Sequence, residues 1–530
     1  MSYCFRLSQP ARWGVKPRLA KRSRGFASSA STWLPVLPIN LTAPNSRSWK
    51  QPVGLFINNE YIESQGADRI TTVNPATEET ICSVHAASGH DVDRAVSAAR
   101  DALRHPSWRN LTGTDRARLM VRLADLVDAH AETLATIETM DNGKPYTVSL
   151  GYDVPDLSSV LRYYAGFADK NFGKTVDLGP EKLAYTTVQP VGVCGQIIPW
   201  NYPLSMAGWK LGPALCCGNT IVLKLAELTP LSMLYVGDLI REAGFPPGVI
   251  NIVNGHGHVA GAALAEHEGV DKIAFTGSTK TGKDVMRLAS GTMKAITLET
   301  GGKSPLIVFD DANLDQAVSW AHGGVMGNQG QVCTATSRLL VQDGVYNEFV
   351  QRFVEFTAKT SVVGDPFDEK TYQGPQVSKA QLDRVNLFIS AAKACGGTIH
   401  QPSASLPSRG FFVQPTILTD LPASHPALHE EIFGPCATIV RFKDEDEALS
   451  VANASRYGLA GAVFTNDVAR AHRVARELEA GMVWVNSSND SDIRMPFGGI
   501  KESGIGRELG EEGLRGYYNV KAVQVNLSGQ

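Results

Sequence analysis

The clearest chemical signal in the sequence is a phosphate-binding pattern. In KIAFTGSTKTGKDV an apolar run is followed by Gly277, and after four further residues come Gly282 and Lys283. This is the spacing of a P-loop, the phosphate-binding loop of many ATPases. A P-loop also needs Ser or Thr after its lysine to bind Mg²⁺, whereas Asp284 would set a carboxylate against the phosphates. The pattern therefore predicts a phosphate site and argues against a P-loop ATPase.

The elements that would position this loop are strands of a parallel, doubly wound sheet. Apolar runs typical of strands alternate with helical patterns, which predicts an α/β fold. One helix is expected to begin with Thr229 as its cap and to end at Gly244, and an earlier one to begin with Thr114 as its cap and to stop at 143–145. The strand-like runs are GQII (195–198), TIVL (220–223), VINIV (249–253) and KIAF (272–275).

Each of these runs is followed by residues that could bind a ligand. Ligands of open α/β sheets bind at the carboxyl ends of the strands, so these residues should meet at one edge. A helix that opens at Ser278 would direct free backbone N–H groups and its positive dipole end toward an anion. The pairs are, in chain order, Trp200 and Asn201, Lys224 and Glu227, Gly255 and Gly257, and Gly277 and Ser278.

A second α/β block is expected from about residue 304 to 500. It contains the strand pattern GMVWVN and the helix pattern DEDEALSVANA. The cleft between the two blocks is the expected place for the chemistry.

Composition excludes several classes of protein. A chain of 530 residues with 43% hydrophobic residues should form two or three domains. A net charge of -3 gives no electrostatic reason to expect nucleic acid or an acidic membrane as partner. The eight cysteines form no CxxC pair, so neither a disulfide scaffold nor a metal site is expected. No apolar run approaches the ~18 residues of a membrane span.

The first fifty residues differ from the rest. They are rich in Arg and Ser, and no acidic residue precedes Glu60. This composition is typical of a mitochondrial transit peptide, which we expect over 1–32, with the matrix as destination. A disordered basic arm is the alternative, while a secretory signal is disfavoured because no apolar region of sufficient length follows the charges.

Eight sequence blocks follow one another along nearly all of 56–526: IIPWNYPL, WKLGPAL, KLAELTPL, FTGSTKTG, LETGGKSP, NQGQVCTATSR, EEIFGP and PFGGIKESGIGRELG. Together they closely resemble the aldehyde dehydrogenase superfamily. The resemblance implies NAD-dependent oxidation of an aldehyde to its carboxylic acid, in the hydrolytic rather than the coenzyme A branch. It also implies a Rossmann-like cofactor domain (52–168 and 191–301), an α/β catalytic domain (302–501) and a small antiparallel oligomerisation arm (169–190 and 516–528) of a dimer or tetramer.

The resemblance also implies catalytic roles. Cys333 would be the nucleophile, since a deprotonated sulfur attacks a carbonyl and the resulting thiohemiacetal can release hydride to leave a thioester. Glu299 would activate the water that hydrolyses the thioester, and Asn201 would form an oxyanion hole with the Cys333 N–H. Lys210 and Glu508 match a proton relay, with a structural ion pair as the alternative. A non-catalytic relative would be expected to have lost Cys333 or Glu299.

For the cofactor, Lys224 and Glu227 resemble the pair that binds the adenosine ribose. The carboxylate accepts hydrogen bonds from free 2′ and 3′ hydroxyls and repels a 2′-phosphate, which favours NAD, although Lys224 leaves some NADP use open. Lys283 would be a solvated helix residue. The complete expected set for the cofactor is Ile197, Trp200, Lys224, Glu227, Gly257, Gly277, Ser278, Thr279, Lys280, Thr281, Gly282, Glu431 and Phe433.

The substrate pocket is the least defined part. By resemblance Tyr202, Trp209 and Phe497 would form an aromatic funnel. The segment 486–495 is polar and Gly327 leaves room near Cys333, so a wider or more polar entrance is expected. Whether Asp490, Asp492 or Arg494 binds a charged aldehyde stays open.

Overall fold

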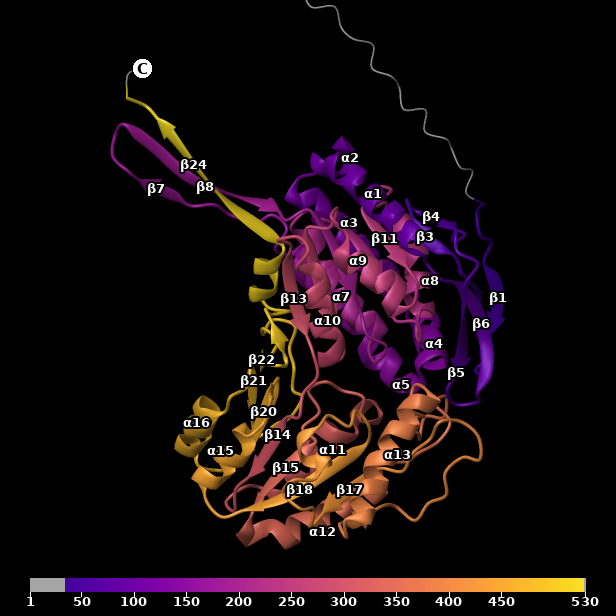
Figure 1. The fold of residues 1–530 in the computed structure, drawn as a ribbon, viewed down its shortest axis with the longest axis vertical. Coiled ribbons are helices and arrows are strands. Elements are labelled where there is room, and N and C mark those ends of the chain that lie inside the picture. Colours follow the sequence, from indigo (N-terminus) through magenta and orange to yellow (C-terminus); the bar gives the residue numbers. More distant parts are fainter. Residues whose placement is uncertain (1–33, 529–530) are drawn as a thin grey trace, which may run out of the picture. The chain divides into compact units, whose positions relative to one another are not determined.

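The computed structural model describes residues 34–528 (Figure 1). The predicted transit peptide at 1–32 lies outside the described residues. All elements below belong to the unit Pro35–Gln530.

The first large sheet has eight strands in the order β23-β13-β12-β9-β10-β11-β3-β4. The five central strands are parallel, as predicted. The edges, which the sequence analysis did not describe, make the sheet mixed, because β3 pairs antiparallel with β11 and β23 pairs antiparallel with β13. The strands are β3 (Leu55–Ile57), β4 (Glu60–Ile62), β9 (Val193–Ile197), β10 (Thr220–Lys224), β11 (Ile250–Val253), β12 (Lys272–Thr276), β13 (Ala295–Glu299) and β23 (Gly504–Ile505).

A tight turn explains the hairpin edge of this sheet. Asn58 and Asn59, between β3 and β4, have φ of 56° and 64°. Two successive residues with positive φ are the requirement of a type I′ hairpin turn, which asparagine tolerates. The turn therefore adds a hairpin to an otherwise parallel sheet.

Two helix starts differ from prediction. Helix α3 (Gly113–Ala129) is capped by Thr112 and not by Thr114, because Thr112 and Asp115 form a reciprocal capping box. Helix α8 (Leu231–Ala243) begins after Pro230 without a side-chain cap, and the Thr229 hydroxyl donates to the Trp200 carbonyl oxygen at 3.4 Å instead. The predicted ends at Gly143 and Gly244 are confirmed, with φ of 86° and 92°. The earlier helix is not continuous as predicted, because it is divided at His130 into α3 and α4, and Gly143 ends α4.

The other helices of this region are α1 (Gly89–Arg104), α2 (Pro106–Arg109), α4 (Ala131–Asn142), α5 (Tyr146–Val148), α6 (Val154–Ala165), α7 (Pro203–Cys216), α9 (Ala262–Glu266) and α10 (Thr279–Ala289). Two π-helical turns, η1 (Ser149–Asp153) and η2 (Gly257–Gly261), precede α6 and α9. Helix α1 packs on the β10 and β11 side, and α3, α6 and α7 pack on one another. The structure thus has the predicted helix-covered sheet.

The second large sheet has seven strands in the order β16-β17-β18-β15-β14-β20-β21, and all but β16 are parallel to their neighbours. The predicted strand GMVWVN contains β21, and the predicted helix DEDEALSVANA contains α15. The strands are β14 (Pro305–Val308), β15 (Arg338–Gln342), β16 (Thr398–His400), β17 (Thr416–Thr419), β18 (Cys436–Phe442), β20 (Ala460–Phe464) and β21 (Met482–Val485). The helices are α11 (Leu314–Met326), α12 (Tyr346–Thr360), α13 (Lys379–Ala394), α14 (Pro426–His429), α15 (Glu445–Asn453) and α16 (Val468–Glu477).

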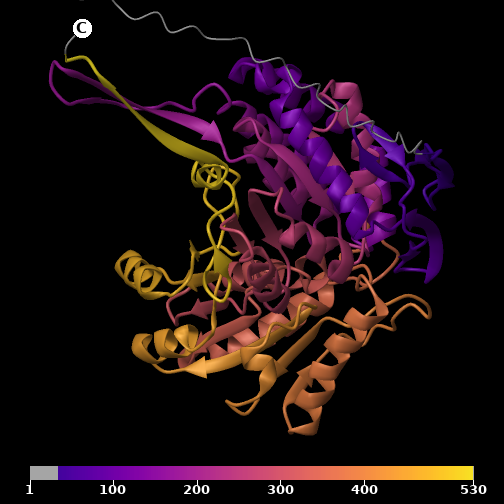
Figure 2. The same ribbon diagram turned by 45° about the horizontal axis from the view of Figure 1, so that its top comes forward.

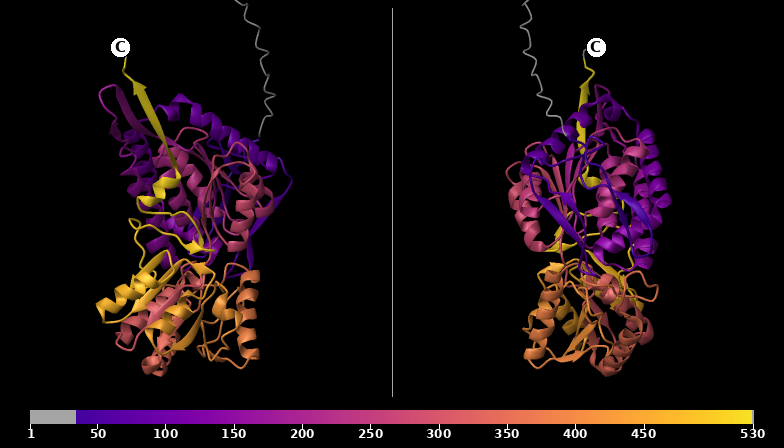
Figure 3. Two further views of the ribbon diagram at one scale, coloured as in Figure 1. Left: turned by 60° about the vertical axis from the view of Figure 1, so that its left-hand side comes forward. Right: turned by 90° about the vertical axis from the view of Figure 1, so that its right-hand side faces the viewer.

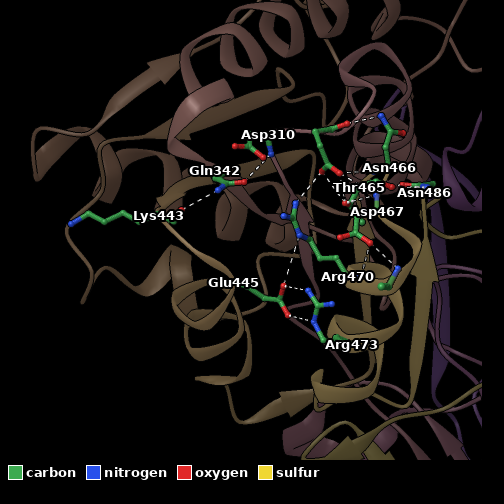
Figure 4. A network of polar contacts seen from close by, with 12 residues as sticks. Asp310, Gln342, Lys443, Glu445, Thr465, Asn466, Asp467, Arg470, Arg473 and Asn486 are labelled. Atoms are coloured by element: carbon green, nitrogen blue, oxygen red, sulfur yellow. Dashed lines mark hydrogen bonds and ion pairs between the residues drawn. The ribbon is translucent and has the colours of Figure 1, made fainter.

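At the carboxyl edge of this second sheet, polar and charged side chains of the chain bind one another. Asp311, which follows β14, accepts hydrogen bonds from the Thr465 hydroxyl at 2.8 Å and from the Asp467 N–H at 3.1 Å. Arg470 extends the network from Asp311 toward Glu445, which also binds Arg473 at 2.8 Å (Figure 4). The place where an open α/β sheet would bind a ligand is therefore filled here.

The predicted antiparallel arm is present. Strand β8 (Lys182–Pro190) pairs antiparallel with β24 (Tyr518–Asn526) and with β7 (Thr175–Asp177). In Figures 2 and 3 this ribbon extends away from both large sheets. It exposes apolar side chains, with Val520 at 63% and Val176 at 48% of their surface accessible.

Smaller elements complete the description. Two-stranded sheets pair β1 (Ile39–Thr42) with β2 (Ser48–Gln51), β5 (Arg69–Asn74) with β6 (Glu79–His85), and β19 (Tyr457–Gly458) with β22 (Ile500–Lys501). Short 3₁₀ turns are η3 (Gly327–Gly330), η4 (Asp343–Val345) and η5 (Glu512–Gly516). Within residues 34–528 no helix is long and apolar enough to cross a membrane, and no group of three metal-ligating side chains gathers. The seven cysteines of this range are free.

Candidate functional site

One cavity of about 860 Å³ brings most of the predicted site together. It lies at the carboxyl edge of the first sheet, where residues that follow β9 and β12 reach it. The second sheet contributes from its amino edge, through the segments that precede β14, β15 and β18. The predicted residues that line the cavity are Trp200, Asn201, Gly277, Ser278, Thr279, Lys280, Glu299, Cys333, Glu431 and Phe433.

The loop that carries Cys333 has an unusual backbone. Helix α11 ends at Met326, and in the following turn Asn328 and Gln329 have φ of 47° and 56°. Left-handed residues other than glycine are strained and concentrate at functional sites. Gly302 approaches so closely that an added Cβ would lie 2.7 Å from the Cys333 carbonyl oxygen. The loop is therefore held tightly against the segment that follows Glu299.

The electrostatic surroundings of Cys333 favour its protonated form at rest. Burial raises the pKa of the Cys333 thiol, and the charges of Glu299 and Glu431 raise it further. The backbone N–H groups of Thr334 and Cys333 act in the opposite direction. A neighbouring base must therefore take the proton before the sulfur can act as a nucleophile.

Glu299, the last residue of β13, is buried, and neither of its carboxylate oxygens has a hydrogen-bond partner of normal geometry within the described residues. Burial raises the pKa of Glu299 well above its ordinary value, and the charge of Glu508 adds to this. Lys210, Arg507 and the Gly499 N–H oppose the shift. A buried carboxyl group with unpaired oxygens and a raised pKa has the properties of a general base that takes a proton from water.

Asn201 is fixed beside the Cys333 loop. Its side-chain nitrogen donates to the Gln331 carbonyl oxygen at 2.9 Å, and its own carbonyl oxygen accepts from Asn328 at 3.1 Å. An amide nitrogen carries two hydrogens, so one remains available to the cavity. The side chain is thus positioned to donate to an oxygen near Cys333.

Lys210 and Glu508 form a buried pair behind the cavity. The Lys210 ammonium nitrogen lies 2.6 Å from Glu508 Oε1 and 2.5 Å from Thr276 Oγ1. Thr276 is the direct neighbour of Glu299 across the β12–β13 pairing. Neither Lys210 nor Glu508 lines the cavity, so any role of the pair acts through Thr276 or Glu299.

The phosphate-binding pattern folds as a helix start and not as a P-loop. The Ser278 side chain accepts from the Thr281 N–H at 3.2 Å and caps α10, while Gly282 packs against Thr300. Lys283 is exposed and lies 2.8 Å from the Glu502 carboxylate, outside the cavity lining. The N-terminus of α10 therefore borders the cavity, while Lys283, the lysine of the P-loop pattern, does not.

Part of the predicted cofactor set lies beyond the cavity lining. Lys224, at the end of β10, is buried and lies 3.0 Å from the half-exposed carboxylate of Glu227. Burial alone would raise the pKa of Glu227, but the charge and hydrogen bond of Lys224, a backbone N–H and the charge of His256 together lower it. Gly257 begins η2, and an added Cβ there would meet no atom within 4 Å. Ile197, Thr281 and Gly282 also lie outside the lining.

The second sheet contributes a carboxylate and an aromatic ring. Glu431 accepts from the Gly302 N–H at 3.1 Å, and burial raises the pKa of Glu431 to about 7. The Phe433 ring packs edge-on against Trp200, with centroids 5.2 Å apart. The sequence analysis missed Gln381 and Arg384 on α13, which line the cavity and donate to the carbonyl oxygens of Phe433 and Glu431, each at 2.6 Å. Only the spacing of two polar residues on one helix face could have indicated them.

The aromatic residues expected around the substrate do line the cavity. Tyr202, Trp209 and Phe497 are among its walls, with the last two rings 4.7 Å apart, and Tyr152 joins them. Asp492 and Arg494 bind each other at 2.5 Å and, like Asp490, do not line the cavity.

Comparison with known proteins gives one consistent result. Residues 61–523 match the model of the Aldehyde dehydrogenase family. The chain is 50% identical to an aldehyde dehydrogenase of Emericella nidulans, over 90% of this chain and 96% of the relative. It is 48% identical to the human protein named aldehyde dehydrogenase, mitochondrial, over 98% of this chain and 99% of the relative. The solved NAD+ complex of aldehyde dehydrogenase from Bacillus cereus matches with a TM-score of 0.88 and 45% identity, over 90% of this chain and 97% of that one.

Proposed function

The chain belongs to the aldehyde dehydrogenase family, and from that premise we propose that it oxidises an aldehyde to the carboxylic acid with NAD, through a thioester on Cys333. The observation that carries the proposal is the single cavity of about 860 Å³. In it a cysteine, an amide donor and a buried carboxyl group with unpaired oxygens share one space with a helix N-terminus.

The residues present fit a dinucleotide. The first-turn N–H groups of α10 suit a pyrophosphate, and the backbone at Gly257 is open, with no atom within 4 Å of an added Cβ. Glu431 uses one oxygen for the Gly302 N–H and keeps the other to accept a ribose hydroxyl. Bound NAD would supply the acceptor for the hydride that leaves the substrate's carbonyl carbon.

Glu227 supports NAD over NADP. Its lowered pKa keeps the carboxylate charged at neutral pH, so it accepts hydrogen bonds from ribose hydroxyls and repels a 2′-phosphate. Lys224, 3.0 Å away, offsets part of this repulsion. We therefore propose NAD as the preferred cofactor.

In the proposed mechanism, Cys333 loses its proton to a base and its sulfur attacks the carbonyl carbon of the aldehyde. A water molecule in the cavity is the proposed base and carries the proton to solvent, so the Glu299 carboxylate stays available for the later hydrolysis. The substrate oxygen becomes negative in the thiohemiacetal and accepts from the free Asn201 hydrogen and the Cys333 N–H. Loss of hydride then leaves a thioester on Cys333.

Hydrolysis completes the cycle. The Glu299 carboxylate takes a proton from water, and the resulting hydroxide attacks the thioester to release the acid and the Cys333 thiolate. The unpaired oxygens of Glu299 are free to bind that water. The Thr276 hydroxyl, which lies next to Glu299 and binds the Lys210–Glu508 pair, gives the proton a path away from the site.

Assembly, domain division and location complete the proposal. We propose that the β7–β8–β24 arm joins copies of the chain, because its apolar side chains are exposed. We also propose the division into a cofactor domain (52–168 and 191–301) and a catalytic domain (302–501).

The mitochondrial matrix is the proposed location, supported by the acid-free basic segment before Glu60 and by the name of the human relative.

The simplest test measures NADH absorbance with a panel of aldehydes for the wild-type protein and for Cys333→Ala. The proposal expects NADH formation with several aldehydes and none above background in the variant. NADH formation that survives Cys333→Ala would refute it. Light scattering of the purified chain, with and without residues 516–528, tests the arm: loss of the oligomer on truncation is expected.

A further inference from the structure

One wall of the cavity carries no side chain at two positions, both occupied by glycine. Gly323 and Gly327 both line it, and a Cβ added at either would meet no atom within 4 Å. They are four residues apart at the C-terminal end of α11, so they lie on the same face. The empty space therefore forms a continuous strip along that wall.

The backbone does not require glycine at either position. Gly323 lies inside α11, and Gly327 has φ of -53°, a value open to any residue. Glycine is a poorer helix former than alanine, so position 323 gains no stability from glycine. Gly324 is different, because a Cβ there would lie 2.4 Å from Ser488 Oγ and close packing explains that glycine.

No large side chain of the segment that follows β21 occupies the space beside Gly323 and Gly327. The loop after β21 contributes Asn489 and Ser491 to the cavity instead of large side chains. Asn489 is held by a hydrogen bond of 3.0 Å from its side-chain nitrogen to the Gly324 carbonyl oxygen. The aromatic wall is fixed in turn, with Trp209 packed against Phe497 and donating to Asp156 at 2.8 Å.

From this wall we infer that the enzyme acts on aldehydes that are bulky beside the carbonyl group, branched or ring-bearing, and that Gly323 and Gly327 determine this specificity. The strip leads directly into the loop that carries Cys333, so the additional space lies where the carbons next to the reacting carbonyl must pass. This inference rests on the proposed oxidation at Cys333 and adds the substrate class to it.

The test compares hexanal with its branched isomer 2-ethylbutanal, which has the same atoms in a wider shape. The wild-type enzyme should oxidise 2-ethylbutanal with a kcat/KM within about threefold of hexanal. Gly327→Phe and Gly323→Leu should each lower kcat/KM for the branched isomer by about 30-fold or more and change that of hexanal by less than about threefold. Gly151→Leu is the matched control, because Gly151 has equally open space but does not line the cavity, and it should alter neither value.

A second readout does not depend on turnover. Alkylation of Cys333, followed by mass spectrometry, is timed with iodoacetamide and with the larger N-benzyl iodoacetamide. The glycine variants should slow the larger reagent selectively. A wild-type enzyme that disfavours the branched isomer more than 30-fold, or variants that affect both isomers and both reagents equally, would overturn the inference. If no aldehyde is oxidised but the glycine variants still slow the larger reagent selectively, the proposed oxidation is wrong. The open space beside Gly323 and Gly327 is then still supported.

Discussion

The Lys210 ammonium group lies 2.6 Å from the Glu508 carboxylate, and both side chains are buried behind the cavity. The pair is joined to Glu299 through Thr276, which binds Lys210 and neighbours Glu299 across two adjacent strands. A buried ion pair costs desolvation energy that an apolar pair avoids, so its stability is a weak reason for its presence. Its connection to Glu299, the predicted general base, agrees with the proposed role of the pair in moving a proton away from Glu299.

Lys210→Met should leave Glu508 buried and unpaired. We expect a loss of about 3–5 kcal/mol in the free energy of unfolding, measured with urea, because a buried charge without its partner keeps its full desolvation cost. The double variant Lys210→Met, Glu508→Gln should be more stable than the single one. A double variant whose loss equals the sum of the two single losses would show that the pair is not coupled.

Asn201→Ala should lower kcat by about 10²–10³, because it removes one of two expected donors to the developing oxyanion. KM for the aldehyde should change little, since the hydrogen bond strengthens in the transition state. The expected split is measured by steady-state kinetics, with the unfolding midpoint as a control for the Gln331 contact. Unchanged turnover in a folded variant would exclude the oxyanion role.

The pH dependence of turnover should follow Glu299. Its pKa is raised mainly by burial, so at low pH the group is protonated and cannot take a proton from water. Turnover should therefore rise with pH through the raised pKa and level off above it. The free energy of unfolding should depend on pH in the opposite direction, because the folded state favours the protonated form of Glu299. The stabilising contribution of Glu299 is therefore complete below the ordinary Glu pKa of about 4.3. It is lost as the pH rises through the raised pKa. Stability of wild type and Glu299→Gln across this range checks the second part, and identical pH slopes would contradict it.

Glu227→Gln should relax the choice of cofactor. Removing the charge opposite a 2′-phosphate should tighten NADP binding by about tenfold, which is 1.4 kcal/mol and modest because the carboxylate is half exposed. NAD binding should weaken by a few fold. Quenching of tryptophan fluorescence measures both, as Trp200 lines the cavity. An unchanged NADP affinity would mean that Glu227 does not face the ribose.

Local patterns predicted the central fold well. The four apolar runs became β9 to β12 with small shifts of their ends, and Ser278 caps α10 as expected. The helix cap at Thr114 was wrong because Thr112 and Asp115 satisfy each other's backbone groups two residues earlier. Thr229 failed as a cap because the Asp141 carboxylate accepts from the Leu231 N–H at 2.8 Å instead. Both corrections involve a competing side chain, and the second comes from a distant helix.

Local patterns alone predicted the site only as a set of residues at strand ends, while Cys333, Glu431 and Phe433 were identified through the family resemblance. That the second sheet presents its amino edge to the cavity depends on the packing of the two sheets, which no local pattern encodes. Gln381 and Arg384 were missed for the same reason, because polar residues on a helix usually face solvent. The bare wall at Gly323 is likewise visible only as space in the folded chain.

The most direct test of the central claim is mass spectrometry of Glu299→Gln after mixing with NAD and a reactive aldehyde. We predict one NADH per site in a burst and an adduct on Cys333 with the mass of the aldehyde minus two hydrogens, because the thioester forms and is not hydrolysed. Wild type, quenched in the same way, should show far less adduct. An unmodified Cys333, or an adduct confined to another cysteine, would contradict the account.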